Sequence, residues 1–591
     1  MKKFRWQIVA WMFGVGVHGG MGVAGAQTAV APPAVPTDIK NLDNADTFDG
    51  VATNFLDFYN LDDLNKAIAK SPDKATPYDD RGAFYLGKKL YDKALADCKK
   101  AVELDPKLLS AHENLARIYR ERKEVANALL EYGKAIALEA PGTYNLGQRG
   151  NYLAELGRNN EALADYNKEI ELAPEEEDGY FWRADLYAQL HQYDKALLDY
   201  NKLIELDPKD ANYHLLHARN LSNLKRFDDA IASYSTALEL NPKSTVAWNE
   251  LGLAYWQTKS YDLAEEKFAR ALTLADGNTA GYIRLNRARM HYEQEKRGAA
   301  LEDLNAVIEQ ETKARTQAKG ALIDTSLAQA YFYRSLINGR GISLISTDSD
   351  KAPIIADATR AVQLDPSLAP EYLNRDRTLL GNFNARYTIV VLLYGAVAAI
   401  PNDIPTLLKL GDAQQNVFKS RDAIATYTRA LALSPQSAQA LKSRATAYGN
   451  AATPYESAQW LPAIADWKRY LAHAATDTEG WQKLGNAQYN AGQTAEGVAT
   501  FRQMIKTNPD NALAHLMLAL GLAISGQGDD AKSEVKIYIE IATDKEKQEA
   551  ISAFGNATTH YPDNAAVKAI YDLIPDKTVP VNDGDNIPFF V

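Results

Sequence analysis

Small and aromatic residues recur along the first half of the chain with a constant spacing of 34 positions. A small residue stands at Gly82, Ala116, Gly150, Ala184, Ala218 and Gly252. Twelve positions later in each block comes an alanine, at Ala94, Ala128, Ala162, Ala196, Ala230 and Ala264. Four positions further on the residue is Cys98, Tyr132, Tyr166, Tyr200, Tyr234 or Phe268. The alanine and the aromatic residue lie one helical turn apart on the same face, so each block predicts two helices that cross at the small residues.

Proline follows the second predicted helix in most blocks, often after Asp or Asn, at Pro106, Pro174, Pro208 and Pro242. Because proline cannot continue a helix, it predicts a turn into the next block. This pattern resembles the tetratricopeptide repeat, a helix–turn–helix unit of the same length. The block with Trp248, Gly252, Tyr255, Ala264 and Phe268 matches the family almost completely. The resemblance implies an all-α, right-handed superhelical solenoid of about 13 repeats.

The register of the repeats divides the chain into six segments. We expect a signal peptide at residues 1–26, an extended leader at 27–51 and an N-terminal array at 52–278. A degenerate segment with insertions follows at 279–403, then a C-terminal array at 404–545 and closing helices with a tail at 546–591. The insertions lie at 311–327, 338–350 and 451–459, and their role is left open. Almost the whole chain after the leader is therefore repeat, which leaves no room for a separate catalytic domain.

The degenerate segment contains an apolar run from Ile389 to Ile400. This run is too short to cross a bilayer. Two interpretations stay open at this point, a buried helix of a poorly matching repeat, in which Asp376 takes the small position, and a self-association face. The tail from Ile587 to Val591 is expected to dock on the last hairpin or to insert into a partner.

The first 26 residues differ from the rest of the chain. Lys2, Lys3 and Arg5 precede an apolar stretch, and Ala24-Gly25-Ala26 forms a small-x-small site, which is typical of a cleavable signal peptide. We therefore expect cleavage after Ala26, a periplasmic or secreted location, and no integral membrane segment in the mature chain. Cleavage removes three basic residues and no acidic ones, so the net charge of −11 becomes −14. An acidic chain of this kind argues against nucleic acid as a partner.

The resemblance also implies a binding surface, because the family lays the first helix of each repeat along a concave face. If each block is numbered from 1 to 34 with the small residue at position 8, the inward positions are 2, 5, 6, 9, 12 and 13. We expect a peptide groove formed by aromatic, Arg, Asn and Asp residues at these positions in the N-terminal array and in the repeat that follows it, namely Arg117, Arg120, Asn151, Phe181, Trp182, Asp185, Arg219, Trp256, Tyr282, Arg289 and Tyr292. The alternative is an ordinary solvated wall whose aromatic residues pack on the adjacent hairpin.

The sequence gives little indication of a metal site or of catalytic residues. His214 and His217 lie three positions apart on one predicted helix, but no third metal ligand can be placed. The single cysteine, Cys98, stands in the aromatic packing position, where a buried thiol is expected. No Ser-His-Asp or Cys-His grouping has recognisable spacing. The sequence predicts no metal, no cofactor and no catalytic residues. Some family members grip a carboxylate with Lys and Asn, but Asp79 and Glu113 occupy the leading positions of such a clamp here.

These observations predict an exported, non-enzymatic scaffold that binds other proteins or peptides through its concave groove. The alternative from a different class is a non-catalytic accessory subunit of an envelope enzyme or of a polysaccharide-export complex. The sequence does not identify the partner.

Overall fold

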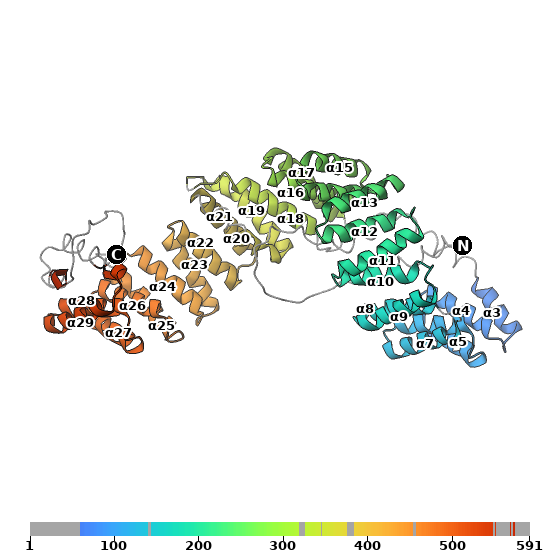
Figure 1. Cartoon of the computed structure of the whole chain (residues 1–591), viewed down its shortest axis with the longest axis horizontal. Helices are drawn as coiled ribbons and strands as arrows, with labels where there is room; N and C mark the ends of the chain where they lie inside the picture. Colours follow the sequence, from blue (N-terminus) through green and yellow to red (C-terminus); the bar gives the residue numbers. More distant parts are fainter. Residues whose placement is uncertain are drawn as a thin grey trace. The chain divides into compact units, whose positions relative to one another are not determined.

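The computed structural model describes residues 60–139, 143–317, 325–343, 345–374, 383–452, 457–547, 550, 568 and 571–573. The predicted signal peptide, the leader, the tail, Asp376 and most of the closing helices lie outside these residues. The elements within them are helices, and the helices form consecutive packed pairs, so the predicted all-α fold class is confirmed (Figure 1). The chain divides into two compact units, Met1–Gln294 and Glu295–Val591.

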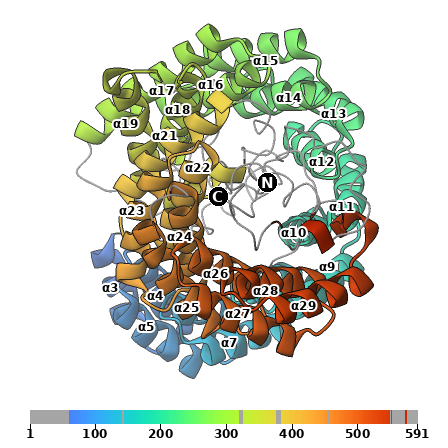
Figure 2. The same cartoon turned by 90° about the vertical axis from the view of Figure 1, so that its left-hand side faces the viewer.

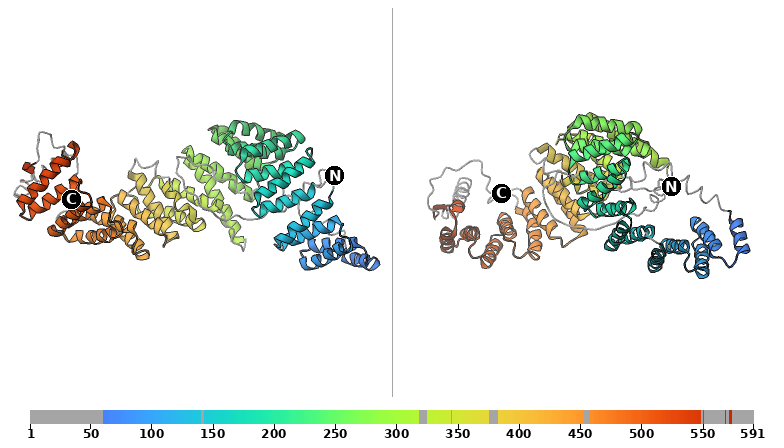
Figure 3. Two further views of the ribbon diagram at one scale, coloured as in Figure 1. Left: turned by 60° about the horizontal axis from the view of Figure 1, so that its bottom comes forward. Right: turned by 45° about the vertical axis from the view of Figure 1, so that its right-hand side comes forward.

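The described part of the first unit contains the helix α3 followed by a row of helical hairpins. Its helices are α3 (Leu61–Lys70), α4 (Ala75–Gly87), α5 (Tyr91–Leu104), α6 (Leu109–Glu121), α7 (Val125–Leu138), α8 (Tyr144–Glu155), α9 (Asn159–Leu172), α10 (Asp178–Gln189), α11 (Tyr193–Leu206), α12 (Ala211–Asn223), α13 (Phe227–Leu240), α14 (Thr245–Gln257), α15 (Tyr261–Leu274) and α16 (Gly277–Glu293). Figure 3 shows the hairpins of this unit stacked side by side.

The second unit repeats the hairpin plan less regularly. Its helices are α17 (Arg297–Gln317), α18 (Thr325–Gly339), α19 (Asp348–Leu364), α20 (Glu371–Asn374), α21 (Phe383–Ala399), α22 (Ile404–Asn416), α23 (Ser420–Leu433), α24 (Ala438–Ala451), α25 (Leu461–Leu471), α26 (Thr478–Asn490), α27 (Thr494–Thr507), α28 (Ala512–Ile524) and α29 (Gly528–Ile541), with short 3₁₀ turns η3 (Pro366–Leu368) and η5 (Ser457–Trp460). α22 to α29 pack as regular consecutive pairs.

The small residue of each block makes room for the aromatic residue of the second helix. A Cβ atom added at Gly150 would come 2.6 Å from the ring of Tyr166, and one added at Gly411 would come 2.4 Å from the ring of Tyr427. Both tyrosines are almost completely buried. The two helices can therefore cross closely only because one side chain is missing, which is the packing that the 34-residue spacing predicts.

Recurrent turn chemistry separates the helices. The second helix of several repeats ends at Asp or Asn, as at Asp105 and Asp207, whose side chains accept the backbone N–H two residues later at 2.9 and 3.0 Å. This turn accounts for the Asp-Pro pairs of the sequence. The next helix starts at a capping side chain in many repeats, for example Ser244, which accepts the Ala247 N–H at 3.2 Å.

The apolar run of the degenerate segment forms the buried core of α21. Val390, Leu392 and Leu393 are almost fully covered, and the helix packs on α19 and α22. A Cβ atom at Gly395 would come 2.5 Å from the Cβ of Ala358, which shows how closely α21 approaches α19. Of the two open interpretations, the structure supports the buried helix. In the described part of the chain, no helix has the length and apolar character needed to span a membrane.

Candidate functional site

The first helices of the repeats lie on the inner side of each row. α4 contacts α6, α8 contacts α10 and α12 contacts α14 directly, and in the second unit α22 contacts α24. Figure 2 shows α10 and α12 on the inner side of their row with α11 and α13 on the outer side, and likewise α22, α24 and α26 inside α23, α25 and α27. We call this inner side the concave face of each unit.

Two of the predicted groove arginines pair with glutamates on the next first helix. Arg219 donates from Nε to both carboxylate oxygens of Glu250, at 2.7 and 2.8 Å, and its side chain is only 23% exposed. Arg120 on α6 donates from Nη2 to Glu155 Oε1 on α8. These guanidinium groups hold neighbouring repeats together, which is a structural role the sequence analysis did not assign.

The aromatic candidates also have partners within the chain. Trp256 is buried and donates from Nε1 to Glu293 Oε2 at 2.7 Å, while the Arg289 guanidinium lies 5.7 Å from its ring centre. Phe181 and Trp182 meet edge to face at 5.1 Å. The structure therefore brings together two pairs of the predicted groove residues, Phe181 with Trp182 and Trp256 with Arg289.

The remaining candidates differ in exposure. Asn151 is buried and accepts the hydroxyl of Tyr166 at 2.7 Å. Asp185 accepts the side-chain amide of Gln189 at 2.6 Å. Tyr282 and Tyr292 are half-buried, and burial raises the pKa of the Tyr282 hydroxyl; Arg117 is exposed. Binding of a partner by these residues stays a prediction.

Further side-chain contacts cross from one first helix to the next in the first unit. We call them cross-repeat rungs, and besides those of Arg120, Arg219 and Trp256 they are Asn114 to Asp79 at 2.9 Å, Asn145 to Glu113 at 2.8 Å and Asn286 to Asn249 at 3.2 Å. Polar groups at these positions therefore largely form hydrogen bonds within the protein. The interpretation of an ordinary wall packed on its neighbours accounts for this part of the concave face.

An arginine fork also recurs that the sequence analysis missed. Arg183 on α10 grips Asp199 on α11 with two hydrogen bonds of 2.9 and 2.6 Å, and its Nη1 donates to Asn167 on α9 at 2.6 Å. This fork therefore joins three helices. The same Arg–Asp grip joins the pairs Arg81–Asp97, Arg149–Asp165, Arg334–Asp357 and Arg444–Asp466. In the first unit, the constant spacing of 16 residues between the arginine and the aspartate is the sequence pattern that could have predicted these forks.

The histidine pair considered as a metal site is engaged in structural hydrogen bonds. His214 Nε2 lies 3.1 Å from the Pro208 carbonyl oxygen, and His217 Nδ1 lies 2.9 Å from Ser233 Oγ. The residues described in the structure contain no group of three or more His, Cys, Asp or Glu able to hold a metal ion. Cys98 is completely buried as expected, and burial raises the pKa of its thiol.

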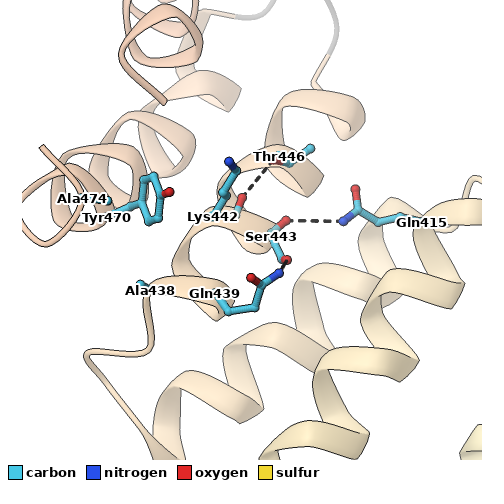
Figure 4. Close-up of a pocket in the computed structure, with 8 residues that line it drawn as sticks. All are labelled: Gln415, Ala438, Gln439, Lys442, Ser443, Thr446, Tyr470 and Ala474. Atoms are coloured by element: carbon cyan, nitrogen blue, oxygen red, sulfur yellow. Dashed lines mark hydrogen bonds between the residues drawn. The ribbon is translucent and has the colours of Figure 1, made fainter. Parts of the chain in front are cut away.

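The second unit contains an open pocket of about 440 Å³ on its concave face (Figure 4). Its lining residues are Gln415, Ala438, Gln439, Lys442, Ser443, Thr446, Tyr470 and Ala474. Gln439, Lys442, Ser443 and Thr446 hold positions 2, 5, 6 and 9 of their repeat, and Gln415 holds position 12 of the one before. The rule for inward positions therefore applies to this pocket, although the sequence analysis used it only for the N-terminal array.

Among the described residues that line the pocket, Lys442 is the only charged one, and its charge is compensated. Its Nζ lies 3.0 Å from Asp477 Oδ2 and 3.1 Å from Glu479 Oε2, and these hydrogen bonds raise its pKa. Burial favours a higher pKa for Asp477, but hydrogen bonds from Tyr470, Lys442 and the Gly480 N–H outweigh it and lower that pKa to about 2. The other lining residues are Ala438, Ala474 and side chains that carry amide or hydroxyl groups, and Gln439 donates to Ser443 Oγ at 3.3 Å.

Family models identify tetratricopeptide repeats in both units. They match residues 75–108, 177–210, 215–279 and 483–535. Proteins built from this repeat are in general interaction scaffolds that bind other proteins or peptides, and the repeat is typically non-catalytic. Among curated proteins, none is similar enough in sequence to count as a match.

Several solved structures resemble parts of the chain. A tetratricopeptide repeat protein from Parabacteroides merdae is 19% identical over 43% of this chain and 98% of its own, with a TM-score of 0.33. MamA from Desulfovibrio magneticus is 20% identical over 28% of this chain and 94% of its own, with a TM-score of 0.26. YrrB, described as a TPR protein with an unusual peptide-binding site, is 21% identical over 31% and 95%, with a TM-score of 0.26.

Proposed function

We propose that this chain is an exported scaffold that holds other proteins or peptides on the concave faces of its repeats, with the pocket between α22, α24 and α25 as a main contact point. The observation that carries the proposal is the position of this pocket. It opens at the inward positions of tetratricopeptide-type hairpins, where the side chains of Gln439 and Lys442 are not packed into the core. Concave, preformed surfaces of this size are typical ligand sites.

Rigid hairpins support such a role energetically. The wall residues are held on α24 by the Arg444–Asp466 fork and by the close packing of Ala445 and Ala447. A preorganised surface loses little conformational entropy when it binds, so more of the contact energy appears as affinity.

Site-specific photo-crosslinking in cells tests this function. A photoreactive phenylalanine analogue replaces Gln439 on the concave face, and in a control chain it replaces Leu433, which is 42% exposed on α23. We expect discrete crosslinked protein adducts from position 439 and none from position 433. Adducts of equal yield from both positions, or none from position 439, would contradict the proposal.

Export is a separate part of the proposal, supported by Lys2, Lys3, Arg5 and the Ala24-Gly25-Ala26 site. N-terminal sequencing of the protein recovered from a periplasmic fraction tests it. The expected mature chain begins at Gln27, and recovery of an uncleaved chain in the cytoplasm would refute export.

A further inference from the structure

An acid stands at a position of the second helix that is apolar in the neighbouring repeats. In the block that forms α8 and α9, position 27 holds Glu169, which is only 4% exposed. The same position is apolar and buried in the other five blocks of the first unit, where it holds Ala101, Ala135, Leu203, Ala237 and Ala271. The chain therefore places one ionisable group in a layer of contacts that is otherwise apolar.

Two glycines make room for this acid. A Cβ atom added at Gly147 on α8 would come 3.0 Å from Glu169 Oε2, and one added at Gly179 on α10 would come 3.2 Å from Glu169 Cγ. No other block of the first unit has glycine at either of these two positions. We call this meeting point of α9 with α8 and α10, formed by Gly147, Glu169 and Gly179, the Glu169 joint. It connects one repeat to the next.

The acid has no partner that compensates a negative charge. Among the described residues, its Oε2 is buried without a hydrogen bond. The charged groups that act on it are themselves acids, namely Asp178 on α10, Glu139 at the end of α7 and Asp165 on α9. Burial and these acids raise the pKa of Glu169 to about 9, so the closed joint holds a proton on the carboxyl group.

The cations of the two facing helices do not change this picture. Arg149 on α8 is paired with Asp165 at 2.7 Å, and Arg183 on α10 is paired with Asp199 at 2.6 Å. A metal ion is not favoured either, because the described residues contain no group of three or more His, Cys, Asp or Glu that could hold one. A proton is therefore the species that neutralises Glu169.

From this arrangement we propose that the Glu169 joint is an acid-locked connection, closed while the carboxyl group is protonated and opened more often as the pH rises towards neutral. An opened joint exposes the carboxyl group to water, where it releases its proton near the ordinary pKa of 4.5. The closed form keeps that proton. It is therefore favoured most below about pH 4.5, and it loses this advantage progressively up to about pH 9.

The opening is local, since repeats of a solenoid contact mainly their neighbours and a weak interface between two of them can open alone. An open joint divides the first unit into a segment that ends with α9 and one that begins with α10. At acidic pH the two segments act as one continuous array. The inference goes beyond the proposed function because it concerns control of the array and not what the array holds.

Hydrogen exchange of the full-length protein at pH 5.5, 6.5 and 7.5 tests the inference. Protection factors are compared, because they correct for the intrinsic effect of pH on exchange. The test variant is Glu169→Gln, which keeps the shape of the protonated acid. The matched control is Glu171→Gln, which removes an exposed acid two residues further along α9. The amides of α13 and α14 serve as an internal reference, because position 27 of α13 is Ala237.

We expect the protection factors of α9 and α10 to fall about 100-fold between pH 5.5 and 7.5 in the unmodified protein and in the control. In Glu169→Gln the change should stay below threefold, as it should for α13 and α14 in every protein. Glu169→Ala, which restores the residue type of most neighbouring blocks, should lose the pH dependence in the same way. An equal fall in α13 and α14, a fall that persists in both Glu169 variants, or no fall in the unmodified protein would overturn the inference.

Discussion

The concave faces of the two units use polar side chains in different ways. In the first unit, Arg219, Glu250 and Asn114 are joined across neighbouring repeats, so polarity there contributes to the rigidity of the array. In the second unit, Lys442 and Asn450 are also joined to neighbouring repeats, through Glu479 and Gln415, but Gln439 and Lys442 line an open pocket as well. The difference shows that position within a repeat determines which way a side chain faces, whereas its neighbours one repeat away determine whether it remains accessible to a ligand.

The largest effect is expected when a cross-repeat rung of the first unit is removed. Arg219→Ala leaves the Glu250 carboxylate, whose side chain is 5% exposed, without its guanidinium partner. We expect a local destabilisation of about 3 kcal/mol, because an unpaired buried charge is costly. Hydrogen exchange of α12 and α14 measures it. Gln439→Ala in the second unit is the control and should change local stability by less than about 0.5 kcal/mol. Equal effects would show that the two faces do not differ.

A second test concerns the arginine forks that join the paired helices in both units. Arg183→Ala leaves Asp199, with a side chain 5% exposed, without its bidentate partner, and we expect a loss of about 2–3 kcal/mol in the opening free energy of α10 and α11. Arg158→Ala removes an exposed pair with Glu161 and should leave the exchange rates unchanged. A comparable loss in both variants would mean that burial is not what gives the fork its strength.

Glu169 is an exception in the first unit, since it is a buried acid with an unpartnered Oε2. Burial, together with Asp178, Glu139 and Asp165, raises its pKa to about 9. The folded state therefore keeps a proton that the unfolded state releases above about pH 4.5, and stability must fall as pH rises from there to about 9.

The variant Glu169→Gln keeps the shape of the protonated acid and removes its titration. We expect it to be more stable by about 3 kcal/mol at pH 7, since pH 7 lies about 2.5 units above the ordinary pKa of 4.5 and each unit corresponds to about 1.36 kcal/mol. Thermal unfolding at pH 5, 7 and 9 checks this. The midpoint of the unmodified protein should fall with pH relative to that of the variant, and parallel curves would show that Glu169 is ionised in the folded state.

The smallest expected effect concerns the turns between paired helices. Lys225 in the first unit has φ of 61°, whereas the second unit has Gly492 at φ of 75°. A side chain in this left-handed conformation costs about 1 kcal/mol. Lys225→Gly should therefore raise the thermal midpoint slightly and Gly492→Ala should lower it. Shifts in the same direction for both would exclude backbone strain as the cause.

Much of the fold follows from residues that pack on each other within one repeat. The spacing from Gly150 to Tyr166 predicts a close crossing, and the ring does fill the space left by the glycine. The burial of Cys98 follows from the same register. α21 illustrates a limit, because its apolar run is equally compatible with internal packing and with self-association, and only its contact with α19 separates the two.

The site was harder to predict, for a physical reason. The N-terminal array was preferred because its repeats match the family pattern best, but a good match reports packing between helices and not access for a ligand. Arg219 has the residue type and the position expected at an interface. Only the position of Glu250 one repeat later shows that the guanidinium group is already paired within the chain. The pocket at Gln439 is lined by side chains from α22, α24 and α25, which no local sequence pattern brings together.

The arginine forks have a mechanical consequence. Where Arg149 or Arg183 pairs with its aspartate, the two helices of the hairpin are held together as one rigid unit. At the equivalent position, Leu115 and Leu251 have no fork, and their paired helices are joined instead by His112 with Glu131 at 2.6 Å and by Lys267 over the Trp248 ring at 5.6 Å. We therefore expect elastic compliance to vary along the first unit, with thermal bending and extension under load concentrated at the hairpins of Leu115 and Leu251.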